Sequence, residues 1–84
     1  MSLTDGTVFV AQRIEVRPSN KYGEYVMFDG EDLDGGEFHA YSTSGVVLQQ
    51  AKALLEKYGG ENGALCLLIT IGRCNKLWQK RYEG

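Results

Sequence analysis

The hydrophobic period of this chain changes from two residues to about 3.6 and then back, which restricts the folds open to it. Residues 7–17 alternate between apolar and polar positions, as a half-buried strand does. The next apolar run, after two further β-rich segments, has helical spacing: Val47, Ala51, Leu54, Leu55 and Tyr58. Residues 64–71, ALCLLITI, are apolar throughout, as in a strand buried on both faces.

These patterns predict three strands, one helix and two more strands. The expected strands are residues 7–17, 22–29, 37–43, 64–71 and 76–82, and the expected helix is residues 44–58. Gln12 interrupts the apolar face of the first strand and indicates a bulge or bend nearby. Thr43 or Ser44 suits the N-cap of the helix, because a hydroxyl accepts from a free N–H of the first turn. Gly59 and Gly60 predict that the helix ends at a glycine in the left-handed conformation.

This order favours an all-β domain with one helix, namely a five-stranded OB-fold barrel (β-β-β-α-β-β). A ferredoxin-like fold needs a helix after its first strand, and an immunoglobulin sandwich needs about seven strands. We expect one domain over residues 1–84, with the helix plugging the barrel, because 84 residues suffice for a single core. Residues 1–3 and 83–84 look like additions left by cloning.

Composition favours a soluble cytoplasmic protein. No apolar run approaches the roughly 18 residues of a membrane span, and the N-terminus has no pattern of a secretion signal. Cys66 and Cys74 are too far apart for a disulfide if residues 66–72 are extended, since these span roughly 20 Å. With one histidine, His39, and no nucleophile pattern or phosphate-binding glycine loop, we expect no enzyme, no cofactor and no small-molecule substrate.

The central stretch GEYVMFDGEDLDGGEFHAYSTSGVVLQQAKALL resembles small bacterial and phage OB-fold proteins that bind single-stranded DNA. The resemblance covers residues 23–55, where two strands lead through a Tyr-Ser end into a helix rich in Leu and Gln. It implies single-stranded DNA, or RNA, as the partner. The alternative is an OB-fold protein-interaction or oligomerisation module, such as a phage or prophage accessory or assembly component.

Single-strand binders combine stacking aromatic side chains with a basic groove. One candidate group lies on the polar face of the first strand and in the second strand: Phe9, Arg13, Arg17, Tyr22 and Tyr25. The other lies on and before the last strand: Arg73, Lys76, Trp78, Lys80 and Tyr82, with Arg81 nearby. The competing interpretation places Phe9 and Trp78 in the core and treats the lysines as protection of a sheet edge.

Charge is the main objection to nucleic-acid binding, because the net charge is −2. Residues 29–37 hold five of the eleven acids, so the remainder has nine bases against six acids, a net of +3. Whether this loop faces the groove therefore decides whether phosphate is repelled. Its carboxylates would suit calcium, but their spacing differs from an EF-hand loop and favours a solvated loop. A homo-oligomer fits either function.

Overall fold

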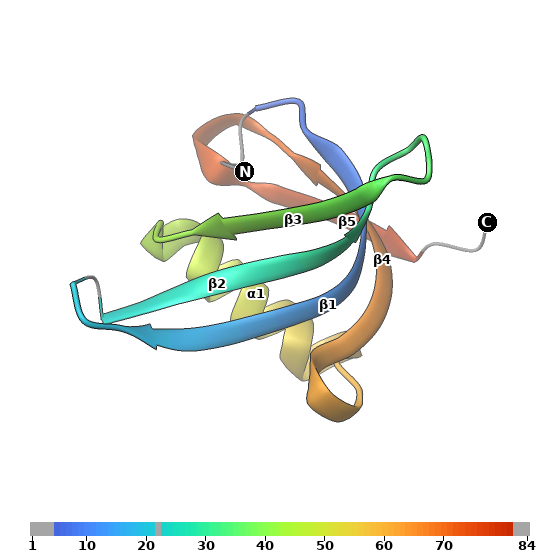
Figure 1. Ribbon diagram of the computed structural model, residues 1–84. Helices are drawn as coiled ribbons and strands as arrows, with labels where there is room; N and C mark the ends of the chain where they lie inside the picture. Colours follow the sequence, from blue (N-terminus) through green and yellow to red (C-terminus); the bar gives the residue numbers. More distant parts are fainter. Residues whose placement is uncertain (1–4, 22, 82–84) are drawn as a thin grey trace.

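The computed structural model of the protein describes residues 5–21 and 23–81, without the side chains of Asn75 and Arg81 (Figure 1). The strands are β1 (Val8–Ser19), β2 (Gly23–Glu31), β3 (Glu37–Ser42), β4 (Ala64–Ile71) and β5 (Leu77–Arg81). The helix α1 (Gly45–Tyr58) lies between β3 and β4. The predicted order of three strands, one helix and two strands is confirmed.

All five strands form one antiparallel sheet in the order β3-β2-β1-β4-β5. The helix α1 lies across one face of this sheet, behind β1 and β2 in Figure 1. Among the described strands β3 and β5 form the two edges, and no ladder of hydrogen bonds joins them into a closed barrel. The mostly-β class with one helix is therefore confirmed, and the sheet is open in its hydrogen bonding. No helix in the described residues is long and apolar enough to cross a membrane.

A bulge at Gln12 sets the course of β1, as the sequence suggested. The register shifts between Ala11 and Arg13 in the ladders with both β2 and β4. The extra residue reverses which side chains face the core, so Phe9 and Ala11 point inward before it and Ile14 points inward after it. The prediction that apolar and polar side chains alternate without interruption through residues 7–17 is therefore wrong.

Phe9 lies in the core and not on the binding face, which corrects its assignment as a binding residue. It is 0% exposed and stacks on Phe38 at a centroid separation of 4.3 Å, with the rings 15° apart. Phe28 packs edge-on against the Phe9 ring, with the ring centroids 5.7 Å apart and the planes at 73°. The period-2 argument placed Phe9 outward because it carried one alternation across the bulge.

The ends of α1 are fixed differently. Of the two predicted candidates, Ser44 and not Thr43 is the N-cap, and its hydroxyl accepts from the Val47 N–H at 3.4 Å. The expected left-handed stop at Gly59 is wrong, since its φ of −66° and ψ of 129° are extended. The Gly59 N–H instead donates to the Leu55 carbonyl. A side chain at position 59 would collide with this carbonyl oxygen, so glycine is required here for its size.

The bulge predicts a strong requirement for glycine at position 30. A Cβ on Gly30 would overlap the Val10 carbonyl oxygen, which the bulge brings toward β2. We expect Gly30→Ala to lower the free energy of unfolding by about 1–3 kcal/mol, as overpacking does. Gly45→Ala is the matched control, because a Cβ there meets nothing within 4 Å and alanine favours the helix. Equal midpoints in urea for the Gly30 variant and the parent would contradict this account.

Candidate nucleic-acid interface

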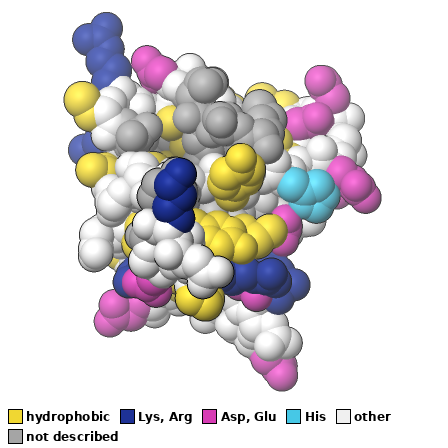
Figure 2. Space-filling view, turned by 60° about the vertical axis from the view of Figure 1, so that its left-hand side comes forward, with side chains coloured by type: hydrophobic (Ala, Val, Ile, Leu, Met, Phe, Trp, Pro, Cys, Tyr) yellow, Lys and Arg dark blue, Asp and Glu magenta, His cyan; other side chains and the backbone are white. Residues whose placement is uncertain are grey.

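The candidate interface lies on the outer face of the sheet, defined here as the side chains that point away from the core. Cross-strand pairing places Val8, Thr70 and Trp78 in one row of this face. The next row holds Glu31, Val10, Leu68 and Lys80. In the space-filling view, hydrophobic side chains lie near the middle of the visible face with basic and acidic side chains around them (Figure 2).

Trp78 is the most exposed described aromatic side chain of the molecule, at 57%. The Lys76 Nζ lies 4.2 Å from the centre of its ring, a cation–π geometry. The turn before β5 supports the ring from beneath, since a Cβ on Gly72 would lie 2.7 Å from the indole Nε1. The aromatic platform is therefore held in place by a lysine and by a glycine that allows close approach.

A hollow of about 120 Å³ adjoins this ring and is called the Trp78 hollow below. Its lining comes from β4 and β5: Leu68, Thr70, Trp78, Gln79 and Lys80. Lys80 lines it, Lys76 lies over its Trp78 ring, and the exposed Arg73 stands in the turn that precedes β5. None of these three cations forms an ion pair with a carboxylate of residues 5–21 or 23–81, so their charge is available to a ligand.

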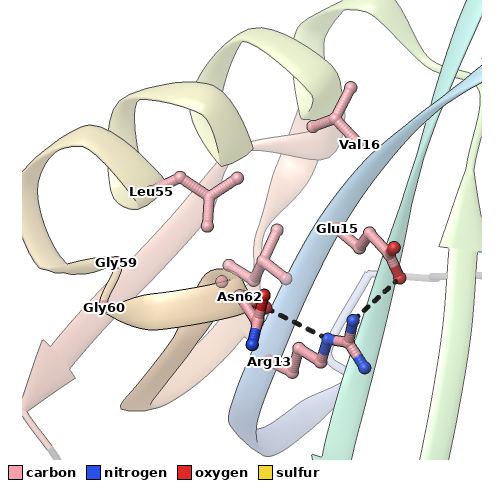
Figure 3. Close-up of a pocket in the computed structure, with 9 residues that line it drawn as sticks. Arg13, Glu15, Val16, Leu55, Gly59, Gly60 and Asn62 are labelled. Atoms are coloured by element: carbon pink, nitrogen blue, oxygen red, sulfur yellow. Dashed lines mark hydrogen bonds and ion pairs between the residues drawn. The ribbon is translucent and has the colours of Figure 1, made fainter.

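Arg13 and Arg17, by contrast, are engaged by the protein. Arg17 pairs with Glu15 at 3.0 Å, and this hydrogen bond raises the pKa of the guanidinium. Arg13 lies 3.6 Å from the same carboxylate and donates to the Asn62 carbonyl at 3.2 Å. It thereby lines a groove of about 450 Å³ between β1 and the end of α1 (Figure 3). These contacts fasten the turn at Asn62 to β1.

The structure separates the two groups that the sequence suggested. Arg17 pairs across the ladder with Tyr25, which is half-buried. Trp78 lies in the row of Val8, and Arg17 follows Val8 by nine residues along β1, roughly 30 Å of extended chain. The two groups are therefore not one compact site. Tyr22 and Tyr82, the other two predicted residues, lie outside the described residues.

The acidic segment lies close to the basic one on the same face. Strand β2 runs to Glu31, beyond the predicted end at residue 29, because its ladder with β3 continues to the pair Glu31 and Glu37. Three strand spacings, about 14 Å, separate Glu31 from Lys80 in their row. The described residues contain no group of three or more His, Cys, Asp or Glu side chains placed to hold a metal.

His39 pairs with two carboxylates next to this acidic segment. Its Nδ1 lies 2.7 Å from Asp29 Oδ1, and its Nε2 lies 3.7 Å from Glu37 Oε2. The hydrogen bond to Asp29 raises the pKa of the imidazole, and Glu37 adds to this effect. When protonated, the ring offsets part of the negative charge of this edge.

Two exposed side chains were missing from the predicted site. Tyr41 is 55% exposed on the outer face of β3, and Leu33 is 66% exposed in the loop between β2 and β3. Alternation with Phe38 and Ala40 would have revealed Tyr41, whereas no periodic signal marks a loop residue such as Leu33.

In comparisons of this chain, no family model, no curated protein and no solved structure matches it.

The His39 pair predicts a pH-dependent contribution to stability. Because the pKa in the folded state is raised above the unfolded value of about 6.5, the stabilisation is fully present below that pH. It is lost as the pH rises through the folded-state pKa. We expect His39→Gln to remove this part of the pH dependence of Tm while leaving the rest unchanged. Parallel profiles for the two proteins in thermal melts from acidic to alkaline pH would refute the assignment.

Proposed function

We propose that this protein binds single-stranded nucleic acid, without catalysis, through the Trp78 hollow and its surrounding cations. The observation that carries the proposal is an exposed indole held under a lysine, beside two further cations that have no carboxylate partner among the described residues. A base stacked on an aromatic ring contributes about 1–3 kcal/mol, and the cations bind the adjacent phosphates.

We propose further that the sheet is an open form of the OB fold. Support comes from the helix between β3 and β4 and from the pairing of β1 with both β2 and β4. In OB folds the loop between strands four and five belongs to the ligand surface. Here that loop carries Arg73 and Lys76 and leads directly into Trp78.

The position of the acids defines the path that a strand can take. Glu31 and its neighbours lie about 14 Å from Lys80, more than one Debye length at physiological salt. A nucleic-acid strand that runs from Arg73 along β5 to Lys80 therefore avoids most of the repulsion from these acids. A nucleic-acid strand that crossed the sheet toward Arg17 would pass close to the carboxylates of Glu15 and Asp29. This repulsion favours a short binding site confined to β4 and β5.

The stacking role of Trp78 predicts a loss of affinity without a loss of fold. We expect Trp78→Ala to weaken binding of a labelled single-stranded oligonucleotide by about 1–3 kcal/mol, measured by fluorescence anisotropy. Tyr58→Ala is the matched control, since Tyr58 is also an exposed ring with a lysine Nζ, that of Lys57, 5.2 Å from its centre. Binding that the Tyr58 change weakens equally would remove Trp78 from the site.

The cations predict the salt dependence of the same binding. Each phosphate contact to a single strand contributes a slope of about −0.7 to log K against log salt. We expect the double variant Lys76→Gln and Lys80→Gln to reduce the slope by about 1.4, because two phosphates then keep their counterions. Replacement of Lys52, which is paired with Glu24 at 2.8 Å, should leave the slope unchanged. No binding by the parent protein at low salt would reject the proposed function.

A further inference from the structure

The loop between β2 and β3 presents an apolar side chain surrounded by acids. Leu33 is 66% exposed, and it lies between Asp32 and Asp34. The neighbouring Glu31 and Glu37 are exposed as well. An exposed leucine within so acidic a segment is a feature that the binding of nucleic acid does not use, because its surroundings repel phosphate.

The conformation of this loop is fixed by Asp32. Its Oδ1 accepts from the N–H groups of Asp34 and Gly36, both at 2.9 Å. The Asp32 N–H donates to the Gly36 carbonyl at 2.9 Å, and Gly35 takes the left-handed conformation at a φ of 85°. A loop ordered in this way loses little conformational entropy when it binds a partner.

The Trp78 hollow has the shape and charge that match this loop. Its volume of about 120 Å³ is close to the roughly 150 Å³ of an apolar cavity that holds benzene, so a leucine side chain fits. Leu68, Thr70 and Trp78 line it, and Lys76 and Lys80 stand near it without carboxylate partners among the described residues. Within one chain Leu33 and Trp78 both remain exposed, so the loop of the same molecule does not fill the hollow.

We propose that the occupant is Leu33 of a second copy, and that two copies form a two-fold symmetric dimer. The loop begins after Glu31, which stands about 14 Å from Lys80 in their shared row on the outer face, and Lys80 lines the hollow. A two-fold axis between them seats each Leu33 in the hollow of the partner and repeats the contact twice, as an isologous interface requires. Asp34 then meets Lys80 across the interface.

The first test is sedimentation velocity of the full chain without nucleic acid, because a base and the Leu33 side chain of a partner would compete for the same hollow and the dimer must be measured before that competition begins. We expect a species of about 18.6 kDa, twice the 9.3 kDa chain, which dissociates as salt rises. Leu33→Ala should weaken the dimer at least tenfold. The matched control is Val46→Ala, which removes an apolar side chain of similar exposure, 54%, from α1. A monomer at every protein concentration, or a dimer unaffected by Leu33→Ala, would overturn the proposal.

A charge swap tests the reciprocal geometry. Asp34→Lys and Lys80→Glu should each abolish the homodimer by placing like charges together. Their equimolar mixture should restore a dimer, because both contacts of the mixed pair again join opposite charges. The loop tolerates the first change, since the described contact of Asp34 is made by its backbone N–H. Failure of the mixture to associate, with both variants folded by circular dichroism, would refute the pairing of loop and hollow.

Discussion

The bulge between Ala11 and Arg13 is the constraint on which the rest of the structure depends. Strand β1 is the central strand of the sheet, and both of its ladders shift register at this point. The bulge turns Phe9 and Ala11 toward the core on one side and Ile14 on the other. It also requires glycine at position 30, where a Cβ would overlap the Val10 carbonyl oxygen of β1. One inserted residue thus determines both the core and the outer face.

The same constraint explains what could and could not be predicted from the sequence. Periodicity was sufficient for the order of the elements, the helix and its Ser44 cap, since these depend on local chemistry. The sequence indicated a bulge at Gln12 but not which residues it would turn over, so Phe9 was assigned to the wrong face. Whether β3 and β5 pair depends on how far the sheet curls, which no local pattern encodes.

For the candidate site, the sequence placed Lys76, Trp78 and Lys80 on one face because β5 has no irregularity. The pairing of Arg13 and Arg17 with Glu15 follows from the same spacing, because the three residues alternate on one face of β1 after the bulge, and it could have been predicted. The place of the acidic segment could not, because the distance from Glu31 to Lys80 is set by strand order. A contact between neighbours in a strand can be predicted from spacing, whereas one across the sheet requires the topology.

The separation of charge across the sheet has an electrical consequence for the whole molecule. Residues 29–42 contain five acids and neither lysine nor arginine, whereas residues 72–81 contain four bases and no acid. The two segments meet the same row of the sheet at its two ends, Glu31 and Lys80, so charge of opposite sign is sorted along one face although the net charge is only −2. For the proposed nucleic-acid ligand, this sorting of charge favours an approach with β5 leading, so the orientation of the encounter matters more than the net attraction.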